Sequence, residues 1–182
     1  MTKTSLAGSR YSGPAIFFHW AVFLLVAAAY AAIELKGFTP RGSAARALAM
    51  GTHEWAGVLV LVLAVPRLLW RLVRGAPAPE EGSRWMQLLA GAMHLLLYLF
   101  IFIQPLLGLL TLAAAGHPLA VPGTGLELAL AAPDDGLKDL FKELHETIGS
   151  AFYAVIGLHA VAALFHHYML GDNTLRRMWR QR

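Results

Sequence analysis

The chain has 182 residues, of which 57% are hydrophobic and only 14% are charged, with a net charge of +4. Because soluble domains usually carry about a quarter charged residues, this composition excludes an ordinary soluble fold and indicates an integral membrane protein. The sequence has no cysteine, which excludes disulfides, thiolate-bound iron–sulfur clusters and Cys-bound zinc.

Four segments are apolar and long enough to cross a bilayer, which takes roughly twenty residues per helix. They span about 14–34, 52–73, 88–113 and 146–170. We expect helices, because a chain in lipid must satisfy its own backbone hydrogen bonds and these runs lack the alternation of barrel strands. The sequence therefore predicts an all-α integral membrane four-helix bundle, with residues 1–182 forming a single domain.

The first segment has small residues, AYAA at 29–32, after a basic start, as a signal peptide does. Its apolar run is too long for a typical signal sequence, and cleavage there would discard His19. We therefore expect this segment to be retained as the first transmembrane helix.

The distribution of Lys and Arg predicts the orientation of the bundle. Ten of these residues flank the side that holds both termini and the loop at 74–84, and five flank the other side. By the positive-inside rule, both termini are expected in the cytoplasm of a bacterial cell, with the chain in the inner membrane. The net charge then reflects topology, and the basic tail RRMWRQR is interpreted as a membrane-surface anchor, with no nucleic-acid partner. The ten are Lys3, Arg10, Arg67, Arg71, Arg74, Arg84, Arg176, Arg177, Arg180 and Arg182, and the five are Lys36, Arg41, Arg46, Lys138 and Lys142.

The loop before the fourth segment contains a helix start. Asp134 or Asp135 can cap a helix whose apolar positions, from Leu137 to Leu144, follow the 3.6-residue period. We expect this amphipathic turn to run directly into the fourth transmembrane helix.

A short repeat, HEWAG at 53–57 and HETIG at 145–149, opens a helix twice on the outer side, which suggests two equivalent roles. Both copies resemble the start of the zincin motif His-Glu-x-x-His. The second histidine is missing from each, which disfavours a metalloprotease.

The histidine spacing on the fourth helix predicts two ligand positions. His145 and His159 are fourteen residues apart, which returns the second ring to within about 40° of the first and moves it about 21 Å along the axis. Depth in the membrane pairs His145 with His53 near the outer side, and His159 with His19 in the inner half.

Two rings facing each other across a bundle core are the geometry of bis-imidazole haem ligation, which suits electron transfer. A histidine hydrogen-bonded to a neighbouring helix is an alternative for one ring. It is hard to sustain for four rings with matched depths, because buried ionisable groups in a membrane are expensive. Gly57 and Gly149, one turn below the outer pair, are expected to leave room for a flat macrocycle, and Ala163 could do the same below His159.

Other polar residues extend this pattern towards the inner side. Arg67 lies fourteen residues after His53 on nearly the same face, so Arg67 and Arg71 are candidates to neutralise haem propionates, with interfacial snorkelling as the alternative. His94 competes with His19 as partner of His159, or serves as a hydrogen-bonding histidine of the core or of a quinone pocket.

His166 and His167 follow one another near the inner surface. His166 lies seven residues after His159 on almost the same face, so it could contact a propionate or donate to a quinone carbonyl. His167 points elsewhere and is expected at the membrane interface.

Several stretches together resemble the prokaryotic cytochrome b561 family of four-helix, di-haem b membrane proteins, and most closely its superoxide-oxidising branch. The resemblance covers roughly residues 10–178, and its most specific part is GLHAVAALFHHY followed by DNTLRRM. The other stretches are FHWAVFLLV (18–26), AAYAAIELKGFTPRG (28–42), VPRLLWRL (65–72) and LHETIG (144–149).

The resemblance implies that His19, His53, His145 and His159 are the axial ligands of two b haems. It also implies the reaction: superoxide outside the membrane is oxidised to O₂ and the electrons pass to ubiquinone, with no protein partner required. The segment 114–136 differs most from the family pattern.

Superoxide is an anion that a basic rim would attract. Acidic neighbours offset the basic residues of the second outer loop, so we expect Lys36, Arg41 and Arg46 of the first outer loop to steer it. The quinone site is expected on the inner half, with His166, Arg10 and Trp20 as wall residues.

Two other functions use the same residues. An electron-transfer subunit could carry quinol electrons outward to a periplasmic partner protein through the same haems. A metal-ion transporter could bind Zn²⁺ or Fe²⁺ through the histidines, but acidic residues in the membrane are scarce, since Glu34, Glu54 and Glu146 all lie near helix ends.

Overall fold

The protein is a bundle of four long helices, seen here in a computed structural model that describes residues 10–78, 80, 83–129 and 131–179. Lys3, Arg180 and Arg182, which entered the charge count, lie outside the described residues. Each long helix is apolar and long enough to cross a membrane. The helices are α1 (Gly13–Gly37), α2 (Ala44–Arg74), α3 (Arg84–Ala114) and α4 (Asp135–Tyr168).

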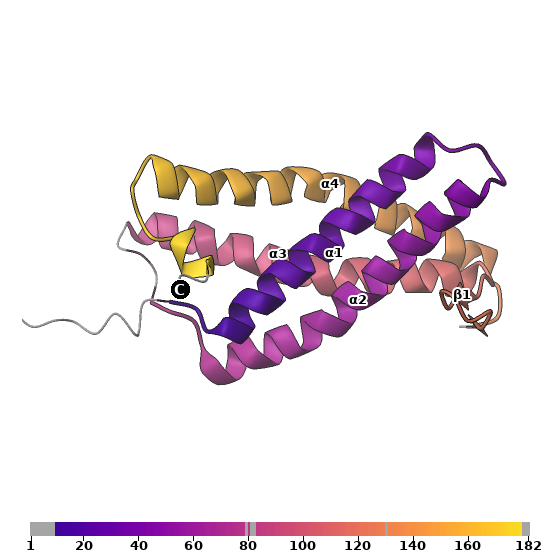
Figure 1. Ribbon diagram of the computed structural model, residues 1–182, viewed down its shortest axis with the longest axis horizontal. Helices are drawn as coiled ribbons and strands as arrows, with labels where there is room; N and C mark the ends of the chain where they lie inside the picture. The colour runs from indigo at the N-terminus through magenta and orange to yellow at the C-terminus, as the bar shows by residue number, and fades with distance from the viewer. Residues whose placement is uncertain (1–9, 79, 81–82, 130, 180–182) are drawn as a thin grey trace, which may run out of the picture.

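The smaller elements lie outside these helices. Strands β1 (Leu119–Ala120) and β2 (Glu127–Leu128) pair antiparallel between α3 and α4. A single turn of 3₁₀ helix, η2 (Arg176–Met178), follows α4. Figure 1 shows the first and last described residues at one end of the bundle, here named the termini end. The opposite end, with the α1–α2 connection and the two strands, is the loop end.

Side-chain caps mark the starts of α2 and α4. The Ser43 hydroxyl accepts a hydrogen bond from the Arg46 N–H at the start of α2, and the Asp134 carboxylate accepts one from the Leu137 N–H at the start of α4. These helices start earlier than the apolar segments at 52 and 146, because hydropathy detects the part of a helix suited to lipid and not its water-exposed first turns. The predicted cap at Asp134 is confirmed, and α4 runs without a break into the transmembrane segment.

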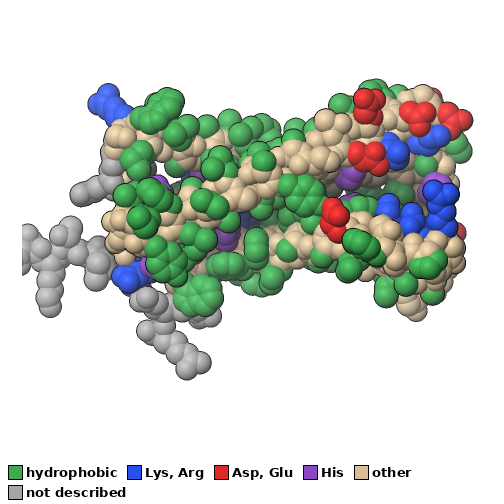
Figure 2. All heavy atoms as spheres, turned by 90° about the horizontal axis from the view of Figure 1, so that it is seen from above, with side chains coloured by type: hydrophobic (Ala, Val, Ile, Leu, Met, Phe, Trp, Pro, Cys, Tyr) green, Lys and Arg blue, Asp and Glu red, His purple; other side chains and the backbone are tan. Residues whose placement is uncertain are grey.

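The helices form two layers. α1 packs along α2, α3 packs along α4, and α2 joins the layers by packing on α3. Apolar side chains cover the outer surface of the bundle, as expected for contact with lipid (Figure 2).

A small apolar core lies midway along the bundle. It is built from Val22, Val60, Ala64, Phe100 and Ile101. Phe100 stacks on Phe152 of α4, with ring centroids 4.1 Å apart and planes at 14°. Phe152 lies seven residues from His145 and seven from His159, so this core separates two levels of the bundle at which histidine rings meet.

Candidate functional site

The first histidine pair lies towards the loop end. His53 of α2 and His145 of α4 have ring centroids 5.9 Å apart, with the planes at 89°. The Nδ1–H of His53 donates to the carbonyl of Ala29 at 2.9 Å, and that of His145 donates to the carbonyl of Gln104 at 3.1 Å. Because a carbonyl only accepts, both rings carry their proton on Nδ1. Their Nε2 atoms are left with a free lone pair, the form of imidazole that binds a metal.

The second pair lies on the other side of the apolar core. His19 of α1 and His159 of α4 have ring centroids 6.5 Å apart, with the planes at 64°. His94 of α3 also faces His159, at 5.6 Å and 82°. The Nδ1–H of His94 donates to the carbonyl of Ala90 in its own helix, at 2.6 Å. The structure therefore brings both of the predicted candidate partners next to His159.

The spacing of the rings fits an iron held between them. An imidazole nitrogen lies about 2 Å from the metal it binds, so two rings on opposite sides of one iron have centroids about 6 Å apart. The ring-centroid separations of 5.9 and 6.5 Å in the two pairs agree with this value. Since α4 is continuous between His145 and His159, helix rise separates the two levels by about 21 Å.

The glycines below the outer pair have different surroundings. A Cβ added to Gly57 would meet nothing within 4 Å, so α2 offers the open backbone expected there. A Cβ added to Gly149 would lie 2.9 Å from Nε2 of Gln104. The expectation of open space at Gly149 is therefore wrong: the missing side chain makes room for the Gln104 amide, which donates to the carbonyl of His145 at 2.7 Å.

His145 and its helix are held in place by three residues that were not predicted from the sequence. Besides Gln104, Gly108 lies against the imidazole, where an added Cβ would be 3.2 Å from its Cε1 atom. The Tyr30 hydroxyl donates to the carbonyl of Gly149 at 2.7 Å and so ties α1 to α4. A signal was available for Gln104, since it is a polar residue inside the apolar run LYLFIFIQPLLGLL at 97–110.

The two candidate propionate partners differ in their surroundings. The guanidinium of Arg67 lies over the ring of Tyr98, 5.4 Å from its centroid. It is also within electrostatic reach of His19 and His159, which places its charge at the level of the second pair. Arg71, one turn further along α2, is exposed.

The three candidate quinone residues lie at or near the termini end, and two already have hydrogen-bond partners. The Nδ1 atom of His166 lies 2.6 Å from the Asp172 carboxylate, and the indole N–H of Trp20 donates to the carbonyl of Met178 at 2.8 Å. Arg10 is exposed. Trp20 therefore has only its ring surface available for a quinone, whereas His166 keeps its Nε2 atom.

Asp172 is held in its charged form by these contacts. Burial raises the pKa of this carboxyl group, but hydrogen bonds from the N–H of Thr174 and from His166 outweigh burial, so the pKa lies below its usual value of 3.8.

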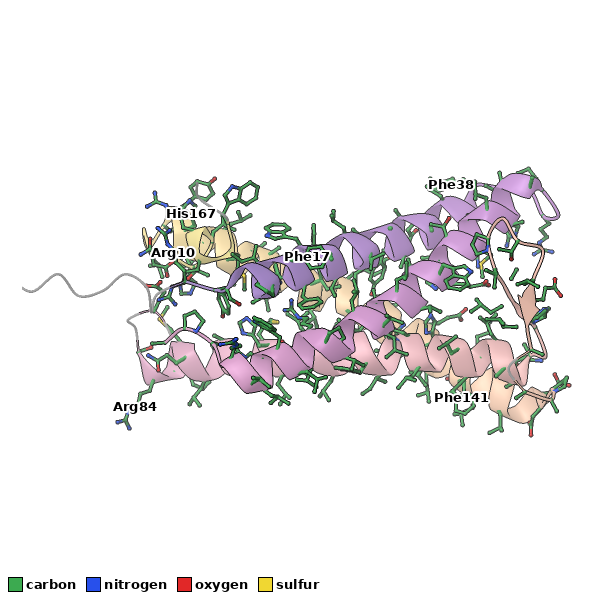
Figure 3. The ribbon with its side chains drawn as sticks, turned by 60° about the horizontal axis from the view of Figure 1, so that its bottom comes forward. Arg10, Phe17, Phe38, Arg84, Phe141 and His167 are labelled. Carbon is green, nitrogen blue, oxygen red and sulfur yellow. The ribbon has the colours of Figure 1, made fainter. Side chains whose placement is uncertain are left out.

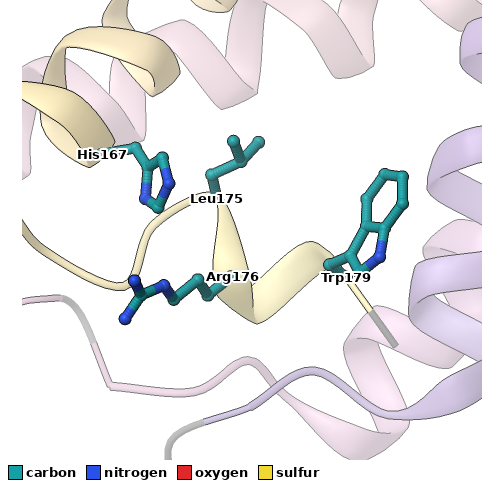
Figure 4. Close-up of a pocket in the computed structure, with 4 residues that line it drawn as sticks. All are labelled: His167, Leu175, Arg176 and Trp179. Atoms are coloured by element: carbon teal, nitrogen blue, oxygen red, sulfur yellow. The ribbon is translucent and has the colours of Figure 1, made fainter. Parts of the chain in front are cut away.

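A shallow pocket of about 180 Å³ opens beside these residues and is lined by His167, Leu175, Arg176 and Trp179 (Figure 4). None of the three candidate quinone residues lines it. His167, predicted to lie at the interface, forms one of its walls.

The basic residues of the first outer loop have unequal roles. Arg46 donates from one guanidinium nitrogen to the carbonyl of Lys36 at 3.0 Å and to that of Thr39 at 3.3 Å, and so holds the loop against α2. Arg41 is exposed, and Lys36 is partly buried.

The lysines at the start of α4 have acidic partners, as expected. Lys138 pairs with Asp135 at 2.5 Å and with Asp139 at 3.7 Å, and Lys142 pairs with Glu146 at 3.5 Å. Figure 2 shows the acidic side chains of this face gathered, with basic ones, near the loop end. The charges of these lysines are therefore offset, whereas the first loop is predominantly basic.

Comparison with known proteins covers nearly the whole chain. The family described as prokaryotic cytochrome b561 matches residues 10–181. Cytochrome b561 homolog 1 of Escherichia coli K12 is 38% identical over 175 residues, which are 96% of this chain and 99% of that protein. Probable superoxide oxidase CybB of Yersinia pestis is 38% identical over 170 residues, which are 93% of this chain and 95% of that protein. Cytochrome b561 homolog 2 of Escherichia coli K12 is 33% identical over 127 residues, 69% and 68% of the two chains.

Long membrane-spanning helices with histidine rings facing across their interior are the architecture of a membrane-bound haem protein. The chain belongs to the prokaryotic cytochrome b561 family. It is a bacterial membrane protein of electron transfer that binds haem b, and the predicted family and helical membrane bundle are confirmed.

Proposed function

We propose that this protein is a superoxide:quinone oxidoreductase of the bacterial inner membrane. It oxidises superoxide to O₂ at the loop end, which faces the periplasm, and delivers the electrons to ubiquinone at the termini end, in the cytoplasmic half. The observation that carries the proposal is the presence of two facing histidine pairs at two levels of one bundle. The similarity to a relative named as a probable superoxide oxidase supports the choice of substrate.

In the proposed protein, His53 and His145 would hold one b haem, and His19 and His159 would hold the other. When bound, the haems supply one-electron transfer between the two ends of the bundle. The hydrogen bonds from His53 and His145 to main-chain carbonyls hold these two imidazoles in the tautomer and orientation that iron requires. Arg67 and Arg71 supply positive charge for the propionates of the haem at the His19 level.

The loop end attracts the substrate. Lys36, Arg41 and Arg46 present a basic rim to the superoxide anion, and the hydrogen bonds of Arg46 keep this loop in place. The lysines of α4 contribute less, because acidic neighbours offset them. Oxidation takes one electron from each superoxide, so two anions yield two molecules of O₂.

The termini end completes the reaction. One ubiquinone accepts the two electrons and two protons to become ubiquinol. His166, Arg10 and Trp20 are proposed to line this site, with Trp20 contributing its ring surface, since its N–H is bonded to Met178. The proton uptake fits a site near the aqueous interface, where His166 and Asp172 form a hydrogen-bonded pair.

The proposal is tested by supplying superoxide to the purified haem-loaded protein together with a soluble ubiquinone. Quinone reduction should proceed with no other protein present, and superoxide dismutase should abolish it. Reduction that dismutase leaves unchanged would contradict the proposal. So would reduction that requires an added periplasmic protein, which would support an electron-transfer subunit instead.

A further inference from the structure

The chain does not end at α4 but folds back across the termini end. After α4 the backbone turns at Gly171, whose positive φ of 68° favours glycine. Residues 172–179, which include η2, then cross towards α1 (Figures 1 and 4). This segment is here named the C-terminal strap.

The start of the strap is fixed to the end of α4. The Asp172 carboxylate lies 2.6 Å from Nδ1 of His166 and accepts a second hydrogen bond, at 2.9 Å, from the N–H of Thr174. Figure 3 shows His167, the next residue of α4, at the same end of the bundle as Arg10, which precedes α1.

The middle of the strap is fixed to the loop between α2 and α3. The Nε atom of Arg177 lies 2.7 Å from the Glu80 carboxylate, and the side chains are only 14% and 24% exposed. A second guanidinium nitrogen of Arg177 donates to the carbonyl of Ala78 at 2.8 Å. This ion pair is mostly shielded from water, so separating the two side chains would leave a shielded charge unpaired. The pair therefore restrains both the strap and the loop between α2 and α3.

The end of the strap contacts Trp20 of α1. The indole N–H donates to the carbonyl of Met178 at 2.8 Å, and the ring meets that of Trp179 edge-on, with centroids 5.8 Å apart. The Trp20 ring also meets the imidazole of His19 edge-on, at 5.5 Å and 78°. Trp20 therefore joins the strap to the second histidine pair.

The two histidine pairs differ in what orients their rings. His53 and His145 each donate to a main-chain carbonyl. No hydrogen bond of this kind joins the ring of His19 or His159 to another of the described residues. Since metal-binding histidines are usually held by a second group, the His19 ring depends on packing, and Trp20 is the neighbour whose own position is fixed by hydrogen bonding.

We propose that the C-terminal strap, anchored by Arg177 and acting through Trp20, fixes the orientation of His19 and thereby tunes one of the two haems. Trp20 and Arg177 are positioning residues in this inference, which rests on the proposed haem ligation by His19 and His159. Ligand orientation and solvent exposure set the potential of a haem. Release of the strap therefore changes the midpoint potential and low-spin signal of the haem at His19, while the haem at His53 and His145 is unaffected.

The chain offers a matched pair of variants for the test. Arg177→Gln and Arg176→Gln each remove one positive charge from η2, but only Arg177 pairs with Glu80. Trp20→Phe keeps an aromatic ring beside His19 and removes the N–H that reaches Met178. The measurements on the haem-loaded protein are hydrogen–deuterium exchange of the peptide containing the strap, and a redox titration with low-spin electron paramagnetic resonance spectra.

In Arg177→Gln and Trp20→Phe, exchange in the strap should become roughly tenfold faster. One of the two redox components should shift with its low-spin signal, and Arg176→Gln should match the parent protein. Unchanged exchange in Arg177→Gln would overturn the anchoring role, and faster exchange with both potentials unchanged would overturn the positioning role. The variant His19→Ala tests the proposed haem ligation separately from the role of the strap. If His19 is not a ligand, this variant keeps both haems. If His19 is a ligand and only the role of the strap is wrong, the variant loses one haem.

Discussion

Gln104 and His145 are joined twice, once through the side chain of each residue. The Gln104 amide donates to the carbonyl of His145 at 2.7 Å, and the imidazole Nδ1–H of His145 donates to the carbonyl of Gln104 at 3.1 Å. One residue of α3 thus holds both the backbone and the ring of a proposed haem ligand on α4. The contact requires Gly149, whose missing side chain leaves space for the amide.

Replacing Gln104 with Leu separates these two bonds. The substitution removes the amide donor but keeps the carbonyl that accepts from the imidazole. We expect a loss of stability on the order of 1 kcal/mol, typical of one hydrogen bond, with the haem content unchanged. Thermal unfolding in detergent and a haem assay measure the two effects. An unaltered melting temperature would show that the amide contributes nothing, and loss of haem would show that the main-chain bond is insufficient.

We expect substitution by alanine to change the stability in opposite directions at two glycines of α4. In Gly149→Ala the new Cβ would lie 2.9 Å from the Gln104 amide, so the amide must move. We expect destabilisation of about 1–3 kcal/mol, as for overpacked sites. Gly157→Ala is the control, because a Cβ there meets nothing within 4 Å, and its higher helix propensity should be neutral or stabilising by up to about 1 kcal/mol. Equal melting temperatures for the two variants would contradict the close packing at Gly149.

The first outer loop predicts a difference between two arginines. Arg41 is exposed, so Arg41→Gln should slow superoxide-driven haem reduction at low ionic strength, with little effect at high salt and none on thermal stability. Arg46→Gln should also lower the melting temperature, because it breaks the bonds to the carbonyls of Lys36 and Thr39. Stopped-flow kinetics across a salt series and thermal unfolding measure these effects. A rate for Arg41→Gln equal to that of the parent at low salt would remove this residue from the steering rim.

We expect the thermal stability of the protein to depend on pH through Asp172. Its hydrogen bonds hold the pKa below the usual 3.8, so the folded state binds this proton less readily than the unfolded state. The Asp172 carboxylate therefore stabilises the folded state above about pH 4, and this contribution is lost as the pH falls through the lowered folded-state pKa. Asp172→Ala should therefore melt at a lower temperature than the parent at pH 7, and the difference should shrink near pH 3. A difference of the same size at both values would show that the carboxylate charge is not responsible.

The sequence was sufficient to predict the helices and the pairing of levels. Hydropathy reports directly on lipid-facing segments, and the 3.6-residue period converts the spacing of His145 and His159 into one face and two depths. The polar first turns of α2 and α4 were missed in the segment boundaries because they lie outside the apolar run. The sequence also left His19 and His94 as competing partners of His159, since both occupy the inner half.

The contacts that support the site could not be predicted in this way. The carbonyls of Ala29 and Gln104 accept from the histidines, and main-chain groups have no residue-specific signature. The bonds of the C-terminal strap depend on a chain reversal that places Arg177 beside Glu80, nearly a hundred positions earlier. Such contacts follow from the packing of helices and loops, and no periodicity in the sequence encodes them.

The haem content of single histidine variants tests the central claim most directly. His19→Ala, His53→Ala, His145→Ala and His159→Ala should each reduce the haem content from two per chain to about one, with loss of one low-spin signal. His117→Ala is the control, since His117 is exposed in the α3–α4 loop and should leave two haems. Two low-spin haems in any of the four ligand variants would contradict the account.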